Sequence, residues 1–401
     1  MRRNTLHALV GTTVLCMVGG SSIFAQETPA TTLTLEGLNE EVEALRRDLE
    51  VARQQTNALS ATANQAVEWR QTARAFHFAG YASAGYTDVE NQTEVFAPVT
   101  FNPLFLFQYR DRVFFEAELE VEIEEDGETE NHLEYANVSY FVNDNLTLSV
   151  GKFLSPLGYF RQNLHPAWVN RLPSAPPGFG HDGAAPESEI GVQLRGGVPI
   201  GDNRLNYSFY IGNGPELDAE DEEVHGILTD GFTRDADGRQ VFGGRLGFQP
   251  SLHFEVGLSA AVGDTSVTED HGIEVEDEPI RDYEAFGVDF VYHWTDAEIR
   301  GEYIRQDIGT APLSVAPEGG EWEAWYLQGN YSFAQNRWEG VLRYADFDSP
   351  HATQRQKQWV VGINRLISAS AILKLAYEIN SNDVGASTDD NRWLFQATYG
   401  F

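Results

Sequence analysis

The stretch FEAELEVEIEE, Phe115–Glu125, alternates glutamate with an apolar residue through five cycles. Period two indicates a β-strand, because successive side chains leave opposite faces of a strand, whereas a helix would scatter both sets around its axis. One face of this strand therefore carries a row of carboxylates and the other a row of apolar groups. Such a strand separates water from a protein core, or water from lipid.

The same alternation recurs from Phe76 to the end of the chain, in segments of about ten residues. The spacers between these segments alternate in length, with seven short ones such as VNDN and IGDN and eight long ones. Short turns that alternate with long loops are typical of transmembrane barrels with an even number of strands. The sequence predicts an all-β fold: a transmembrane antiparallel β-barrel of about 16 strands over residues 76–401.

Both ends of the chain favour export. Residues 1–25 combine a basic start with an apolar run and predict a signal peptide, which contains the only cysteine, Cys16. The last segment, NRWLFQATYGF, alternates aromatic residues and ends on Phe401. This ending resembles the signature of bacterial outer-membrane barrels that the barrel assembly machinery reads. We expect an outer-membrane protein of a Gram-negative bacterium, with that machinery as a partner through Phe401.

A heptad repeat precedes the barrel. After a linker at residues 26–34, residues 35–75 predict an N-terminal α-helical coiled coil in the periplasm, and the attractive pairs Glu41–Arg46 and Asp48–Arg53 favour a parallel bundle. Its predicted core residues are Leu35, Leu38, Val42, Leu45 and Leu49. The alternative is a single amphipathic helix that packs on another surface.

A sixteen-stranded barrel is wide enough to hold water, so its inner face carries charge. The predicted pore-lining acidic residues are Glu116, Glu118, Glu120, Glu122, Glu124 and Asp289. The predicted pore-lining basic residues are Arg195, Arg245, Arg300, Arg343, Lys374 and Arg392. We expect the two sets to lie on opposite walls and to create a transverse field. The net charge of -34 excludes nucleic acid as a partner.

The longest loop, residues 154–187, is the third long one and is rich in proline and aromatic residues. We expect it to fold inward and to narrow the pore; the alternative is a loop packed flat on the rim. Its predicted constriction residues are Arg161, His165, Trp168 and Arg171.

The motif Gly151-Lys152-Phe153, followed by Pro156 and Gly158, resembles the phosphate-selective porin O and P superfamily. The added coiled coil resembles that of trimeric dicarboxylate-type porins. The resemblance implies a homotrimeric sixteen-stranded channel. Phosphate-selective members have a lysine-rich lumen, whereas this chain has only Lys152, Lys357 and Lys374.

We therefore expect a porin for passive diffusion of small hydrophilic or charged solutes. The alternatives are a substrate-selective anion channel for phosphate or dicarboxylate, and a structural tether between the outer membrane and the cell wall through peptidoglycan. Outer-membrane lipid and lipopolysaccharide are further expected partners. No Ser/His/Asp grouping indicates a lipase or protease, so we expect no enzyme, no cofactor and no metal. The acidic segments Glu216–Gly226 and Glu269–Asp282 are interpreted as solvated loops, with divalent-cation binding as the alternative.

Overall fold

The computed structural model describes residues 74–123, 127–180, 183–234, 238–351, 354–381 and 390–401. The predicted signal peptide, the linker, Glu124 and residues 35–73 of the predicted coiled coil lie outside these described residues. Arg74 and Ala75, predicted to end the coiled coil, instead begin the first strand.

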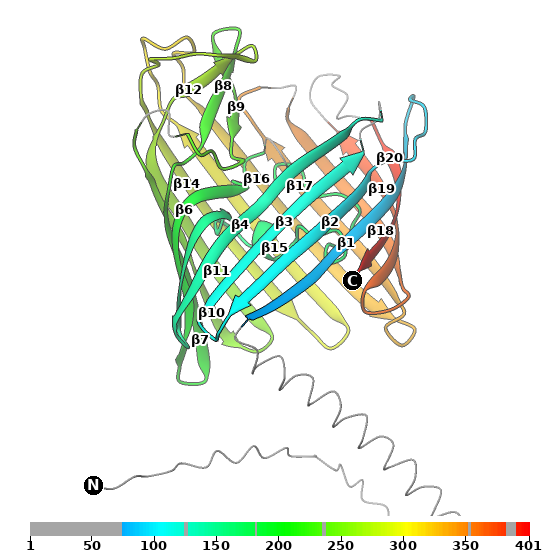
Figure 1. The fold of residues 1–401 in the computed structure, drawn as a ribbon. Coiled ribbons are helices and arrows are strands. Elements are labelled where there is room, and N and C mark those ends of the chain that lie inside the picture. Colours follow the sequence, from blue (N-terminus) through cyan, green and yellow to red (C-terminus); the bar gives the residue numbers. More distant parts are fainter. Residues whose placement is uncertain (1–73, 124–126, 181–182, 235–237, 352–353, 382–389) are drawn as a thin grey trace, which may run out of the picture. The chain divides into compact units, whose positions relative to one another are not determined.

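Sixteen antiparallel strands close into a barrel, as the spacing of turns and loops predicts (Figure 1). Turns of two to four residues alternate around the barrel with connections of five to thirty-three residues. We call the two ends of the barrel the short-turn end and the long-loop end. The strands are β1 (Arg74–Val89), β2 (Val99–Tyr109), β3 (Val113–Ile123), β4 (Thr129–Asn143), β5 (Leu146–Leu154), β6 (Ser188–Ile200), β7 (Asn203–Gly212), β10 (Val241–Ser251), β11 (Phe254–Thr265), β14 (Arg281–His293), β15 (Ala297–Ile308), β16 (Gly320–Phe333), β17 (Trp338–Asp348), β18 (Gln356–Leu366), β19 (Ala371–Ser381) and β20 (Arg392–Gly400).

The two faces of each strand differ because successive side chains alternate between lumen and exterior. Along β14, Tyr283, Ala285 and Asp289 point inward and are buried, whereas Phe286 is 48% exposed on the outer wall. Such outward apolar residues occur all around the barrel and fit a surface that faces lipid rather than water. In β3 the glutamate side chains from Glu116 to Glu122 line cavities inside the barrel, and Ile123 faces outward.

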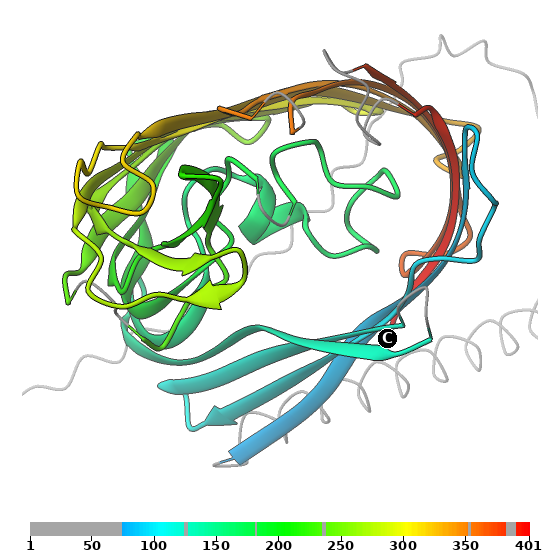
Figure 2. The same cartoon turned by 90° about the horizontal axis from the view of Figure 1, so that it is seen from above.

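The third loop, residues 155–187, lies inside the ring of strands and includes the single-turn helix α2 (Phe160–Leu164) (Figure 2). The ring of Phe179 in this loop packs edge-to-face against the ring of Tyr326 on β16, with 5.1 Å between the ring centroids. These side chains belong to a buried apolar cluster, which also includes Tyr283, Ile304 and Trp322 on the inner wall. The part of the lumen beside β14–β17 is therefore packed with side chains.

Parts of the acidic segments interpreted as solvated loops form a second, four-stranded sheet, so the interpretation as loops is wrong for those parts. Its strands are β8 (Glu216–Glu220), β9 (Glu223–Leu228), β12 (Val267–Asp270) and β13 (Ile273–Glu274). We call this sheet of β8, β9, β12 and β13 the outer sheet. It contributes Leu217, Val224, Ile227 and Val267 to a buried cluster that also contains side chains of the barrel. The charge of the first segment, Glu216–Gly226, concealed its strands, because its acidic residues are interleaved with Leu217, Ala219 and Val224, which are buried in the core.

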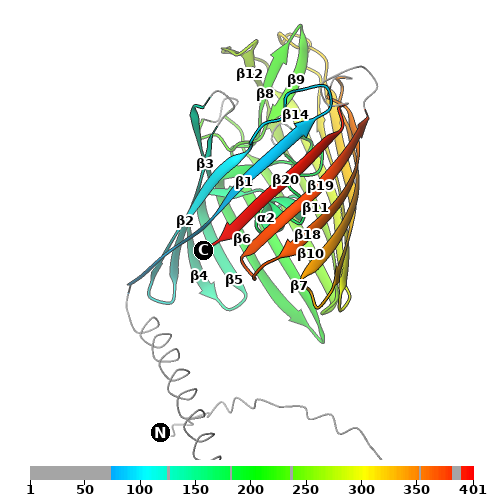
Figure 3. The same ribbon diagram turned by 90° about the vertical axis from the view of Figure 1, so that its right-hand side faces the viewer.

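The barrel closes where β20 pairs with β1, from Tyr81 opposite Gly400 to Val89 opposite Arg392 (Figure 3). Phe401 continues this ladder through two backbone hydrogen bonds with Gly80, of 3.1 and 2.9 Å. Among the described residues, no helix has the length and apolarity needed to cross a membrane.

Candidate pore constriction

The third loop is fixed at its start by an inner-wall carboxylate. Glu302 on β15 accepts the backbone N–H groups of Tyr159 at 3.0 Å and of Phe160 at 2.9 Å, where α2 begins. Gly158 just before them has φ +81°, and a Cβ at this position would lie 1.7 Å from Glu302 Oε1. Only glycine therefore fits here, which gives a physical reason for the last position of the sequence motif.

Basic residues of the inner wall hold the remainder of the loop. Arg343 donates to the carbonyl oxygens of Ser174 and Ala175 at 3.0 and 3.1 Å. Lys374 Nζ donates to the carbonyl oxygen of Ala167 at 2.5 Å. Both side chains are predicted to line the pore, but they are at most 1% exposed. That prediction is wrong for them, because the loop covers this wall and its backbone carbonyls need donors.

The predicted separation of acidic and basic walls is also wrong, because the charges pair. Arg245 lies between Asp289, at 2.5 Å, and Glu255, at 3.1 Å. The other pairs are Arg195–Glu116 at 3.3 Å, Arg300–Glu298 at 3.1 Å and Arg392–Glu378 at 2.5 Å. Arg300 and Asp289 are buried, whereas Arg195 stays partly exposed. Pairing lowers the cost of placing charge in a partly covered lumen.

The predicted constriction residues also face acids. Arg161 pairs with Glu187 at 2.6 Å, and Arg171 Nε lies 3.6 Å from Glu339. His165 places Nδ1 2.7 Å from the carbonyl oxygen of Arg161 and Nε2 3.7 Å from Glu118 Oε1. Trp168 is 37% exposed. The basic residues of the loop thus do not make it a strongly positive surface.

Three cavities lie between the third loop and the wall formed by β1–β7. The long-loop chamber holds about 300 Å³ and is lined by Ser83, Glu120, Glu122, Glu134 and Arg161, among others. The middle chamber holds about 350 Å³, with Glu116, Glu118 and Gln193 in its lining. The short-turn chamber holds about 460 Å³ and includes Arg204.

Neighbouring chambers share lining residues. Tyr81 and His165 line both the long-loop and the middle chamber. Gln162, Asn163 and Arg195 line both the middle and the short-turn chamber. The three chambers therefore form a series along one side of the lumen, which we call the conduit. Where its first two chambers meet, Tyr81 donates its hydroxyl hydrogen to Glu118 at 2.6 Å, and Glu118 is 1% exposed.

Sequence reasoning missed Tyr81, Glu134, Gln193 and Arg204. Glu134 lies at a bulge, where Glu118 pairs with Tyr135 but Leu119 pairs with Leu133. The bulge shifts the alternation by one residue, so a strict period of two assigns Glu134 to the wrong face. The described residues contain no group of three or more His, Cys, Asp or Glu side chains placed to hold a metal ion.

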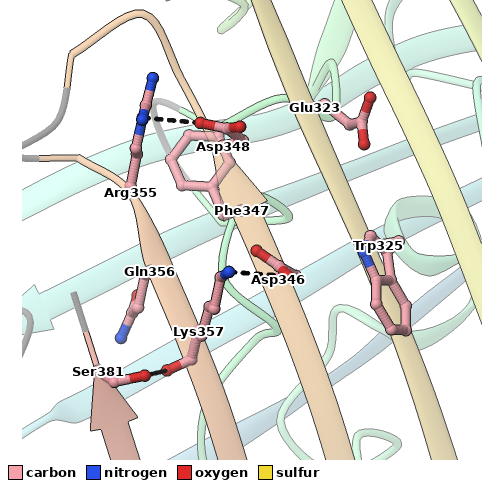
Figure 4. Close-up of a pocket in the computed structure, with 9 residues that line it drawn as sticks. All are labelled: Glu323, Trp325, Asp346, Phe347, Asp348, Arg355, Gln356, Lys357 and Ser381. Atoms are coloured by element: carbon pink, nitrogen blue, oxygen red, sulfur yellow. Dashed lines mark hydrogen bonds and ion pairs between the residues drawn. The ribbon is translucent and has the colours of Figure 1, made fainter. Parts of the chain in front are cut away.

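A further pocket lies on the outer wall rather than in the lumen (Figure 4). It is lined by Glu323, Trp325, Asp346, Phe347, Asp348, Arg355, Gln356, Lys357 and Ser381. Arg355 pairs with Asp348 at 2.7 Å, and Lys357 lies 3.9 Å from Asp346. Trp325 packs on Tyr344 directly below these charges, at 5.1 Å between ring centroids. The outer wall thus changes from aromatic to charged toward the long-loop end.

No family model matches the chain, and no curated protein matches it. Among solved structures, the anion-selective porin from Comamonas acidovorans superposes with a TM-score of 0.56 at 14% identity, covering 82% of this chain and 100% of that one. The outer membrane channel DcaP of Acinetobacter baumannii gives 0.54 at 12% identity, covering 82% and 98%. The trimer form of OmpT from Vibrio cholerae gives 0.52 at 13% identity, covering 82% and 100%. The chain has the sixteen-stranded barrel fold of these outer-membrane porins.

Proposed function

We propose that the chain is an outer-membrane porin through which small hydrophilic solutes diffuse passively. The observation that carries this proposal is the conduit. Its long-loop and middle chambers are both lined by Tyr81 and His165, and its middle and short-turn chambers are both lined by Arg195 and Asn163. Polar and charged side chains line it, so it suits water and hydrated solutes. In such barrels the short turns are periplasmic and the long loops extracellular.

A single engineered cysteine tests the conduit. The only cysteine of the sequence lies in the predicted signal peptide, so the mature chain is expected to have no thiol. Ser83→Cys places a thiol in the long-loop chamber, and Ser381→Cys places one on the outer wall as a matched control. In planar bilayers, a bulky membrane-impermeant thiol reagent should lower the conductance of Ser83→Cys and leave that of Ser381→Cys unchanged. Purified protein without conductance would refute the porin proposal.

Selective anion transport, of phosphate or dicarboxylate, is the second candidate. Its support is the arginines of the short-turn chamber, Arg195, Arg204 and Arg245, together with the similarity to an anion-selective porin. Carboxylates dominate the long-loop chamber, and we therefore favour a general pore with a modest preference for cations. Reversal potentials in a salt gradient distinguish the two, because their sign gives the preferred ion.

We further propose that the functional unit is a homotrimer, joined by barrel walls and by the predicted coiled coil. The heptad pattern and the exposed apolar side chains of the outer wall support this assembly. Leu45→Asp with Leu49→Asp should weaken the oligomer in detergent without unfolding the barrel. An equally stable oligomer after deletion of residues 26–73 would show that the coiled coil is not needed.

The outer-wall pocket supports a position for the membrane. Charged side chains are costly in the hydrocarbon layer, so the ring of Trp325 belongs near the interface and Asp346, Asp348 and Lys357 belong with the headgroups. Lipopolysaccharide is the proposed lipid contact there. Recognition of Phe401 by the barrel assembly machinery, a peptidoglycan contact of the coiled coil and a tethering role remain predictions from the sequence.

A further inference from the structure

We infer that the conduit carries a graded charge along its axis, acidic at the long-loop end and without this negative excess at the short-turn end, so that it passes a larger current when cations enter from the long-loop side. This inference rests on the proposed porin function. It replaces the transverse field expected from the sequence with an axial one.

The acidic end is the long-loop chamber. Glu120, Glu122 and Glu134 line it, and its one guanidinium is that of Arg161. Arg161 is already neutralised by Glu187 at 2.6 Å, and Glu187 does not line the chamber. The three carboxylates therefore give this chamber an excess of negative charge.

The opposite end is the short-turn chamber, lined by Arg195, Arg204 and Arg245 against two carboxylates, Asp144 and Glu255. Arg245 contributes least to the field, because Asp289 and Glu255 bind it. Arg204 is exposed, and Arg195 has a single partner at 3.3 Å, Glu116. The negative excess of the long-loop chamber therefore disappears toward this end.

The two ends lie far enough apart to act separately. Glu122 lines the long-loop chamber, and Glu116 is the partner of Arg195, which lines the short-turn chamber. The two glutamates are six residues apart on β3, which corresponds to about 20 Å. The screening length is about 10 Å at 0.1 M salt, so an ion in one chamber is affected mainly by the charges of that chamber.

Asymmetry of current follows from this arrangement. When the long-loop side is positive, cations enter through the chamber that attracts them and anions enter through the opposite end, so both accumulate in the conduit and conductance rises. The reverse potential pulls both kinds of ion away from the middle and depletes it. Conductance should therefore be larger when the long-loop side is positive. Ammonium-bearing solutes should pass from that side faster than carboxylates of the same size.

The test is the current–voltage relation of channels whose orientation is fixed by one-sided addition and checked with the Ser83→Cys thiol. At 0.1 M KCl, the current with the long-loop side positive should exceed the opposite current by about 1.5-fold or more, and at 1 M KCl, where screening acts over about 3 Å, the ratio should approach one. Glu120→Gln with Glu122→Gln should lower the ratio at 0.1 M. Glu323→Gln with Asp346→Asn, on the outer wall, should keep it.

Arg204→Gln provides an independent variant at an exposed position, should the double glutamate variant fail to fold. It should also lower the ratio, while increasing the preference for cations. Channels that conduct normally but symmetrically at 0.1 M KCl would overturn the inference and leave the porin proposal intact. A ratio that Arg204→Gln and the double variant both leave unchanged would overturn it as well. A complete lack of conductance would instead refute the porin proposal.

Discussion

Tyr81 donates its hydroxyl hydrogen to Glu118 at 2.6 Å, and His165 of the third loop approaches the same carboxylate to 3.7 Å. Tyr81 lies on β1 and Glu118 on β3, so the bond spans β2. The three side chains meet where the long-loop chamber joins the middle chamber. One side of this junction is formed by Tyr81 and Glu118, which lie on strands and are joined by a hydrogen bond. The other side is formed by His165 of the third loop.

We expect His165 to limit conductance at this junction. His165→Ala removes the imidazole between two chambers and should raise single-channel conductance, whereas His165→Trp should lower it. His253→Ala, in an exposed short turn, is the matched control and should leave conductance unchanged. Equal conductance in wild type and both His165 variants would mean that ions bypass this junction.

Glu302 should keep the third loop in place. Glu302→Ala leaves the part-buried N–H group of Tyr159 and the buried N–H group of Phe160 without their acceptor, and an unpaired buried group costs about 1–3 kcal/mol of stability. We expect noisier open-channel current and a lower unfolding temperature. Glu302→Gln retains one acceptor oxygen and should have a smaller effect. Glu284→Ala, on the outer face of β14, should resemble wild type; noise equal to that of Glu302→Ala would argue against a specific anchor.

Phe401 should stabilise the closure of the barrel. Its ring stacks on Phe101 at 6.1 Å and lies 5.9 Å from Phe78, between centroids. Aromatic pairs contribute about 0.5–1.5 kcal/mol each, so Phe401→Ala should lower the temperature at which the folded band disappears in gel electrophoresis. Phe395→Ala, equally outward on β20, is the control. A larger loss in the control would mean that lipid contact, rather than ring stacking, dominates.

The architecture of the barrel was predictable because its signals are local. Alternation within ten residues sets the faces of each strand, and turn length sets the two ends. Glu116, Glu118, Glu120 and Glu122 thus share one face of β3 and line cavities inside the barrel. The apolar packing beside β14–β17 is also visible in the sequence pattern. On β14 the inward residues Tyr283 and Ala285 are apolar, as is the outward residue Phe286.

The site was less predictable because its contacts are distant in sequence. Glu302 bonds to Tyr159 across 143 residues, and Lys374 bonds to Ala167 across 207. A basic residue on the inward face of a strand can point into water or donate a hydrogen bond to a buried carbonyl oxygen, and the sequence pattern is the same in both cases. The sequence thus places Lys374 and Arg343 on the inner wall, while only the path of the loop determines that they are covered.

His271 should show the electrostatics of the outer sheet. Its hydrogen bond to Asp270, together with Asp221, raises its pKa above the ordinary value of 6.5. A raised folded-state pKa means that this contribution to stability is complete below about pH 6.5 and is lost as the pH rises through the folded-state value. Asp270→Asn should lower the midpoint of the His271 titration measured by NMR. An unchanged midpoint would assign the shift to other carboxylates.

Leu217 should hold the outer sheet on the barrel. It is fully buried in β8, with Val224 and Val267 in the same apolar cluster. Leu217→Ala leaves a cavity and should lower stability by about 2–5 kcal/mol. We expect this loss to destabilise the small outer sheet rather than the barrel. We expect faster proteolytic cleavage within residues 213–240, while the barrel stays folded. Ile273→Ala removes an exposed side chain from the same sheet and is the matched control. Equal cleavage rates in the two variants would mean that the sheet is held by its edges and ion pairs, whereas selective cleavage of Leu217→Ala would identify the buried face as its attachment.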